Sequence, residues 1–223
     1  MWGTGARAML VLATLALANG QANAAAAPRS RAGEACELHI IPGGAFFVND
    51  QTDIPMGGVL PALLTEAIRI KRPKTVEQLM QDRLSPATQV RIFSEPDTFK
   101  SLKMDLKIIF EDVARAPQLK NFKDLYTLPR LTSSTASCYK ELIVYGSAVF
   151  RSFGLKMFNT TFAYRSFGPG TAPIYSVVKT AESGLRRFPP RASEEDIEPA
   201  LLELEAAFRQ NVFFFLSKKL KHP

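Results

Sequence analysis

The stretches SCYKELIVYGSAVF (residues 137–150) and LKMFNTTFAYRSF (residues 155–167) decide the fold of this 223-residue chain. Both runs are rich in β-branched and aromatic residues, and the phrase RSFG separates them. Apolar side chains alternate onto both faces of the second run. The pattern therefore predicts a long β-hairpin that is covered on one face and partly covered on the other.

The segments around the hairpin predict further strands and helices. Alternating apolar residues predict three more strands, at residues 36–42, 104–113 and 172–190. Apolar residues spaced by three and four predict three helices, at residues 59–70, 75–84 and 193–220. Thr75 and Gln78 also have the capping-box spacing that begins a helix. Residues 43–58 are expected to form a loop, and residues 88–93 a short strand or turn.

This order of elements predicts an α/β (α+β) two-layer sandwich. Helices would pack on a small mixed sheet that contains the long hairpin, and the chain would end in a long amphipathic helix. The apolar stripe of residues 193–220 is continuous, and lysines close it where the helix dipole favours cations. The chain length suits one core-bearing domain, expected at residues 36–223.

The N-terminal residues have the three parts of a secretory signal peptide. Arg7 precedes an apolar run that is too short to cross a bilayer, and the sequence Ala22, Asn23, Ala24 matches a signal-peptidase site. We expect residues 1–24 to be removed and residues 25–35 to form a flexible tether. The protein would then act in a bacterial periplasm or be secreted, in soluble form or in peripheral contact with a membrane.

Cys36 and Cys138 are the two cysteines of the chain. In an oxidising compartment a disulfide between them is the favoured hypothesis, because each opens a predicted strand. Two reduced thiols, a lipid anchor at Cys36 and a nucleophilic Cys36 are the alternatives. The anchor lacks a lipobox directly after the signal, and His39 lies three residues from Cys36, on the opposite face of a strand.

The chain carries a formal net charge of +7, and its basic residues gather in a few places. The candidate binding residues for an anionic partner are Arg69, Lys71, Arg72, Lys74, Arg151, Arg165, Lys218 and Lys219. Arg151 and Arg165 belong to a repeated aromatic-Arg-Ser-Phe-Gly phrase, and paired arginines recognise anionic groups. Solvated strand and helix ends are the alternative interpretation. An exported chain rarely meets nucleic acid, so the expected partner is an envelope protein or an anionic envelope component.

Motifs for catalysis and metal binding are weak. Ser137 and Lys140 fit the S-x-x-K pattern of serine enzymes, but they open a β-rich stretch and the companion motifs are missing. The phrase IPGGAFF matches a phosphate-cradling loop only loosely. His39 and His222 are the two histidines, which argues against a histidine triad or a zinc site. We expect no cofactor and no metal, and a small exported serine hydrolase using Ser137 and Lys140 is the alternative function.

The phrases CELHIIP, DLKIIFEDVA, CYKELIVYGSAVF, MFNTTFAYRSFG and LLELEAAFRQNV resemble those of uncharacterised exported bacterial envelope proteins. The order of elements is also distantly similar to the α/β accessory domains of the curli-secretion lipoprotein and TolB amino-terminal class. This resemblance implies a domain that acts through protein–protein contact in the envelope and carries no catalytic residues. The lipobox cysteine common in that class is missing here. The expected function is therefore that of a non-enzymatic envelope protein that binds its partner through basic surfaces.

Overall fold

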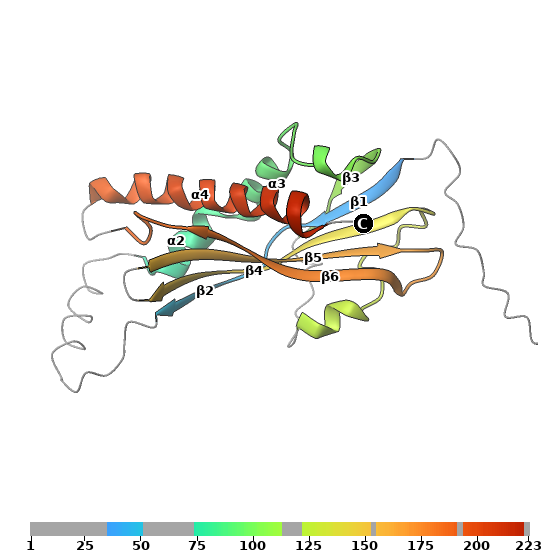
Figure 1. The fold of residues 1–223 in the computed structure, drawn as a ribbon, viewed down its shortest axis with the longest axis horizontal. Coiled ribbons are helices and arrows are strands. Elements are labelled where there is room, and N and C mark those ends of the chain that lie inside the picture. The colour runs from blue at the N-terminus through green and yellow to red at the C-terminus, as the bar shows by residue number, and fades with distance from the viewer. Residues whose placement is uncertain (1–34, 51–73, 113–121, 153–154, 191–193, 221–223) are drawn as a thin grey trace, which may run out of the picture.

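A mixed β-sheet organises the chain (Figure 1). The structure is a computed structural model that describes residues 35–50, 74–112, 122–152, 155–190 and 194–220. The strands run in the order β3-β1-β4-β5-β6, and β2 also pairs with β4. Their bounds are β1 (Cys36–Ile41), β2 (Ala45–Asp50), β3 (Leu106–Phe110), β4 (Tyr139–Ser152), β5 (Leu155–Phe167) and β6 (Pro173–Gly184).

Helices cover one face of this sheet more fully than the other. One face carries α2 (Val76–Arg83), α3 (Pro86–Phe93) and α4 (Ile197–Phe214), while the short helix η3 (Phe122–Tyr126) lies on the opposite face (Figure 1). The remaining helical turns are η1 (Lys100–Leu102), η4 (Glu194–Asp196) and η5 (Phe215–Lys219), the last being a π-helical turn. This arrangement confirms the α+β fold with its long hairpin and long C-terminal helix. Within the described ranges no helix has the length and apolarity needed to span a membrane.

Strand β4 holds the sheet together because it has three neighbours. Both β1 and β2 pair with it in parallel, one after the other: Ile41 lies opposite Ile143, and Ala45 lies opposite Gly146. The antiparallel β5 pairs along the full length of β4. Two short strands therefore share one edge of one long strand, and the chain must turn sharply between them.

Gly44 allows this turn to pass close to β4. Its φ is +90°, in the left-handed region that favours glycine, and an added Cβ would lie 2.9 Å from backbone atoms of Tyr145 and Gly146. The buried Gln89 fixes the preceding residue, since its Nε2 donates to the Gly43 carbonyl over 3.1 Å and its Oε1 accepts from the Gly43 N–H over 2.9 Å. The glycines of IPGGAFF thus serve a strand junction.

Two local predictions are wrong, and one local prediction is confirmed. Residues 45–50 form β2 because pairing with β4 stabilises a segment too short to be recognised by its own pattern. Residues 88–93 belong to α3, in which the Ser85 side chain accepts from the Thr88 N–H and a proline occupies the first turn. The capping box of Thr75 and Gln78 is present at the start of α2. The helix expected at residues 59–70 lies outside the described residues.

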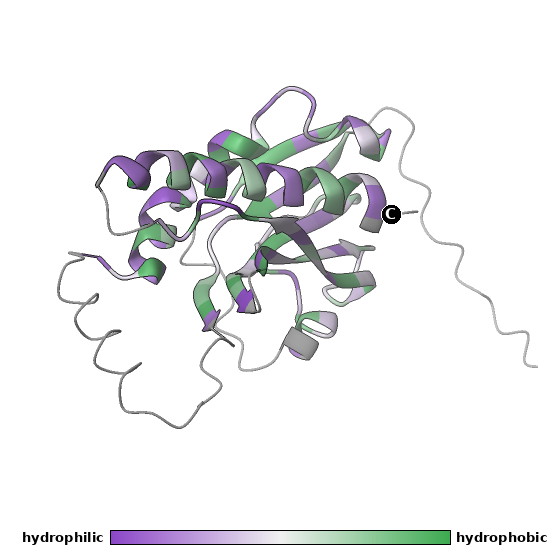
Figure 2. Ribbon diagram, turned by 60° about the vertical axis from the view of Figure 1, so that its left-hand side comes forward, coloured by the Kyte–Doolittle hydropathy of each residue, from purple (hydrophilic) through white to green (hydrophobic). Residues whose placement is uncertain are grey.

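Apolar side chains form a main core between the sheet and α4 and a smaller core beneath η3. In the main core Phe162 of β5 contacts the rings of Phe208 and Phe215. The smaller core on the opposite face consists of Ile41, Leu125, Ile143 and Ala163. Figure 2 shows α4 with alternating hydrophobic and hydrophilic residues, as expected of a helix that covers a sheet on one side. The hairpin is thus covered fully on one face and partly on the other, as predicted.

Replacing Gly44 by Ala is expected to lower the free energy of unfolding by at least about 2 kcal/mol, because the new Cβ combines a left-handed φ with a backbone clash. Gly170→Ala is the matched control, since a Cβ there meets nothing within 4 Å. Urea unfolding of both variants measures the difference. Equal stability of the two variants would contradict the close approach at the β1–β2 junction.

Candidate functional site

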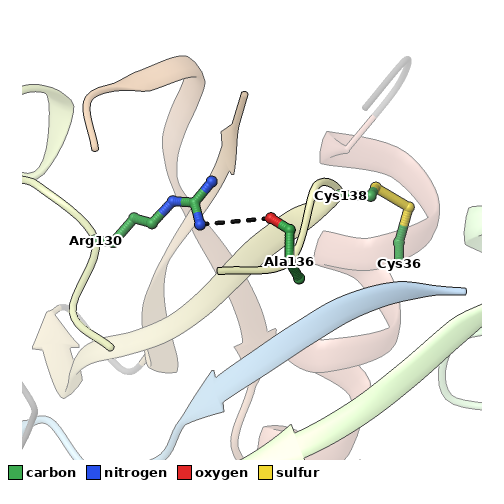
Figure 3. The surroundings of a disulfide bond; sticks show 4 residues. All are labelled: Cys36, Arg130, Ala136 and Cys138. Atoms are coloured by element: carbon green, nitrogen blue, oxygen red, sulfur yellow. Dashed lines mark hydrogen bonds between the residues drawn. A yellow bond between two sulfur atoms is a disulfide. The ribbon is translucent and has the colours of Figure 1, made fainter. Parts of the chain in front are cut away.

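A disulfide joins β1 to the residue that precedes β4 (Figure 3). The Cα atoms of Cys36 and Cys138 lie 4.8 Å apart, within the usual range for a disulfide. This proximity follows from the parallel pairing of the two strands, in which Glu37 lies opposite Tyr139. The bond spans a sequence separation of 102 residues. In the chain-entropy account a loop of this length contributes about 4–5 kcal/mol. The predicted pairing is confirmed.

Arg165 lies in the interior, which corrects its place among the surface residues expected to bind an anion. Its side chain is 0% exposed, and it forms a buried ion pair with Glu141 across the β4–β5 ladder. The Arg165 Nε donates to Glu141 Oε2 over 2.9 Å. The Arg165 Nη2 donates to the same carboxylate oxygen, and a fully buried guanidinium with these partners is unavailable to a ligand at the surface.

This ion pair also holds the segment that crosses the second face of the sheet. Arg165 donates to the backbone carbonyls of Leu125, Leu128 and Pro129. The shortest of these bonds, to Leu128, is 2.6 Å long. Glu141 Oε1 accepts from the Leu131 N–H over 2.7 Å and from the Tyr139 hydroxyl over 2.6 Å. The charged groups of Arg165 and Glu141 therefore both have hydrogen-bond partners besides each other, as buried ions require.

Arg130 fastens the next part of the same segment. Its guanidinium carbon lies 4.6 Å from the centroid of the Tyr139 ring and 5.6 Å from that of Phe167. Its Nη1 donates to the carbonyls of Ser134 over 2.8 Å and Ala136 over 3.5 Å (Figure 3). The segment from residue 125 to residue 136 is thus held by side chains that come from the hairpin and from the segment itself.

A polar hollow of about 500 Å³ lies beside this segment. In it His39 of β1 stands between two carboxylates: its Nδ1 is 2.6 Å from Glu111 Oε1, and its Nε2 is 3.2 Å from Glu37 Oε2. Glu37 also accepts from the Ser134 hydroxyl over 2.6 Å and from the Lys107 ammonium over 3.0 Å. Local pattern could not reveal this site, because His39 and Glu111 are 72 residues apart and meet only through β1–β3 pairing.

The hollow does not have the geometry of a serine hydrolase. The Ser134 hydroxyl donates to Glu37 rather than contacting the imidazole of His39. The hydrogen bonds from Ser134 and Lys107 lower the pKa of Glu37 from 4.5 to about 2, so Glu37 is a poor proton acceptor. Among the described residues no group of three or more His, Cys, Asp and Glu side chains is placed to hold a metal ion. The hollow therefore acts as a hydrogen-bonded link between β1, β3 and residues 132–136.

Ser137 and Lys140 do not form the catalytic dyad considered for the alternative function. Lys140 is 6% exposed, and its ammonium lies 5.5 Å from the centroid of the Tyr164 ring. Burial lowers the pKa of this lysine. Within the described part of the chain the Lys140 ammonium makes no hydrogen bond, so it is not placed to act as the base of Ser137, which is exposed before β4.

The other basic residues expected to bind a partner are either exposed or lie outside the described residues. Lys74 is exposed and pairs with Asp82 over 2.6 Å. Lys218 is exposed at the end of the last helix. Arg69, Lys71 and Arg72 lie outside the described residues, as does the side chain of Lys219.

Four basic residues gather at the end of the hairpin. Arg151 and Lys156 lie directly opposite each other on β4 and β5, and Asp50 of β2 lies opposite Arg151 on its other side. The Lys156 carbonyl accepts from the Leu185 N–H over 2.8 Å, and its ammonium donates to the Arg186 carbonyl over 3.4 Å. These contacts place the exposed Arg186 and Arg187 beside the hairpin. We name Arg151, Lys156, Arg186 and Arg187 the hairpin-end basic cluster.

The Glu203 side chain of α4 accepts from the backbone N–H groups of Arg186 and Arg187, and not from their guanidinium groups. The Glu203 oxygens accept from the N–H groups of Arg186 over 2.9 Å, Arg187 over 2.7 Å and Phe188 over 2.8 Å. Burial raises the pKa of Glu203, but the three hydrogen bonds outweigh it, and the pKa is lowered. Neither arginine side chain forms an ion pair within the described ranges. The sequence contains this Arg-Arg pair before two prolines, but no local pattern distinguishes it from other exposed charges.

No protein-family model matches the sequence, and no curated protein matches it. Among solved structures, the chain is similar to the hypothetical protein CT253 from Chlamydia trachomatis, with a TM-score of 0.30 and 12% identity over 80% of this chain and 98% of that chain. It is also similar to the lipoprotein GNA1162 from Neisseria meningitidis, with a TM-score of 0.25 and 10% identity over 74% and 91% of the two chains. Scores this low do not establish a common fold, so the functional proposal rests on the residues of this chain.

Replacing Arg165 by Met is expected to cost about 3–5 kcal/mol of unfolding free energy, because it leaves the Glu141 carboxylate buried without its charge partner. Adding Glu141→Leu should recover part of this loss. Arg91→Met is the control, since Arg91 is 57% exposed in its ion pair with Glu205 and its loss should cost much less. Denaturant unfolding that finds equal losses for Arg165→Met and Arg91→Met would contradict the role given to the buried pair.

Acid should destabilise the protein through Glu37. Because its folded-state pKa of about 2 lies below 4.5, ionised Glu37 stabilises the fold above pH 4.5, and this stabilisation is lost as the pH falls toward 2. Its full size is up to about 3 kcal/mol. The drop in unfolding free energy between pH 6 and pH 3 should therefore be smaller in Glu37→Gln than in the wild type, with the exposed Glu77→Gln as control. Parallel pH curves for Glu37→Gln and wild type would show that this carboxylate has no such role.

Proposed function

We propose that this chain is an exported, non-enzymatic protein of the bacterial cell envelope that binds an anionic partner through the hairpin-end basic cluster. The partner is an acidic protein or an anionic envelope component. The N-terminal signal pattern and a disulfide suited to an oxidising compartment support the location. The burial of the Lys140 ammonium against the Tyr164 ring argues against the alternative of a serine hydrolase.

One observation carries this proposal: Arg186 and Arg187 are exposed, and the carboxylate of Glu203 beside them binds their backbone N–H groups. Glu203 binds three consecutive N–H groups and so orders the segment without neutralising its side chains by a direct ion pair. Lys156 lies beside them, since its ammonium donates to the Arg186 carbonyl over 3.4 Å. An anion that bridges the exposed guanidinium groups of Arg186 and Arg187 would gain charge-assisted hydrogen bonds.

The surroundings of the cluster carry both signs of charge. Exposed carboxylates lie on β6 at Glu182 and in η4 at Glu195 and Asp196. Attraction of the partner is therefore expected to depend on direct contacts with the cluster and to weaken with added salt. Lys74, Lys218, Lys219 and the basic residues at 69–72 remain secondary candidates for the same partner.

Two double variants that remove the same charge test this proposal. Arg186→Gln with Arg187→Gln should weaken binding to fluorescently labelled polyphosphate about tenfold at low ionic strength, because two exposed charge contacts are lost. Lys218→Gln with Lys219→Gln removes two charges at the other end of α4 and should leave the affinity within about twofold. Fluorescence anisotropy gives both dissociation constants.

The two variants also separate the possible outcomes. A loss confined to the Lys218 and Lys219 variant would move the binding surface to the C-terminal end. Equal losses in both variants would mean that net charge alone drives binding, and either result would contradict a site at the hairpin end.

A further inference from the structure

The hairpin end also presents an apolar surface, on the face of the sheet turned away from α4. Val149 and Phe158 lie in the main core, so their neighbours Phe150 and Met157 point to the opposite face, where they are directly paired across β4 and β5. Both are partly exposed. On this same face Leu155 is 69% exposed.

Strand β2 extends this surface. Phe46 and Val48 pack against the main core, so Phe47 between them points to the other face, where it is 58% exposed. Phe47 and Phe150 line the same shallow groove of about 190 Å³. We name Phe47, Phe150, Leu155 and Met157 the apolar hairpin-end face.

The basic and apolar groups alternate along the same strand ends. Arg151 follows Phe150 on β4, and Lys156 lies between Leu155 and Met157 on β5. Because neighbouring side chains point to opposite faces, the end of the hairpin is apolar on one face and basic on the other. A soluble anion would use only the basic groups and would leave Leu155 and Phe47 in water. An anionic lipid bilayer offers phosphates to the cluster and hydrocarbon to the apolar face.

We propose that the hairpin end docks on the surface of an anionic lipid bilayer, with Leu155 and Phe47 entering the headgroup–acyl boundary and the basic cluster contacting lipid phosphates. This inference rests on the proposed function, because it names the anionic component. The disulfide lies at the other end of β4, a strand of 14 residues and so roughly 45 Å long. The bound protein would hold the disulfide and the His39 hollow away from the lipid.

Vesicle flotation tests the docking. The chain used begins at Ala25, which keeps every described residue and removes the apolar N-terminal segment that would itself enter lipid. We expect binding to phosphatidylcholine vesicles that contain about one third phosphatidylglycerol, and little binding to phosphatidylcholine alone. Leu155→Ser should weaken binding to the anionic vesicles about tenfold, because the apolar contact is lost. Ile174→Ser is the matched control, since Ile174 is 72% exposed but lies at the start of β6, near the opposite end of the sheet.

Polyphosphate binding separates failure of this inference from failure of the proposed function. Leu155→Ser should bind polyphosphate as the wild type does. If Leu155→Ser binds anionic vesicles normally while Arg186→Gln with Arg187→Gln does not, the anion site stands and lipid insertion is overturned. If the wild type binds polyphosphate but not the vesicles, the partner is another anionic molecule, such as an acidic protein. Equal losses in Leu155→Ser and Ile174→Ser would mean unspecific adhesion and would also overturn the inference.

A tryptophan at residue 155 reports insertion directly. Trp2 is the single tryptophan of the chain and is missing from the chain that begins at Ala25, so Leu155→Trp provides the sole fluorophore of its kind. Its emission should shift to shorter wavelength on addition of the anionic vesicles, while that of Ile174→Trp should stay unchanged. An unchanged spectrum at residue 155 on vesicles that bind the protein would contradict insertion.

Discussion

The sharing of β4 by three strands is the constraint on which the rest of the structure depends. Because β1 and β2 use the same edge of β4 in succession, the chain must turn between them at Gly44, where a side chain has no room. The remaining edge of β4 is filled by β5, so the hairpin runs through the whole sheet. Its two ends therefore become the two ends of the molecule, one bearing the disulfide and the other the basic cluster.

The two faces of this sheet are stabilised by different physics. The face beneath α4 is an apolar core with aromatic contacts. The opposite face has only a small apolar core, and buried charge supplements it: Arg165 and Glu141 hold the backbone of residues 125–131, and Glu37 and His39 link β1 to residues 132–136 and β3. Buried ion pairs add little net stability but are costly to break, which makes this face sensitive to single substitutions. At the hairpin end Phe47 and Leu155 are exposed, and so are Arg186 and Arg187.

Much of this architecture follows from local patterns in the sequence. The hairpin, the amphipathic helix α4 and the capping box at Thr75 are encoded within short windows, and the disulfide follows from compartment and strand starts. Strand β2 and helix α3 could not be predicted from local patterns. Strand β2 depends on pairing with β4, and α3 depends on packing in the main core. Arg165 looks like any exposed strand-end arginine until its partner Glu141, 24 residues away, is placed opposite it. The sequence indicates part of the proposed site at the hairpin end, since the repeated phrase singles out Arg151. Arg186 and Arg187 could not be singled out, because their position depends on hydrogen bonds from their backbone to Glu203 of α4.

The hairpin end, and not the C-terminal end, is the surface proposed to bind the partner. Hydrogen–deuterium exchange of the bound and free protein, read by mass spectrometry on anionic vesicles, tests this claim across the chain in one measurement. Binding at the hairpin end should slow exchange in peptides that contain Leu155 and Arg186, with no change in peptides that cover η5 or the residues around His39. Slower exchange confined to η5, or spread evenly over the chain, would contradict it.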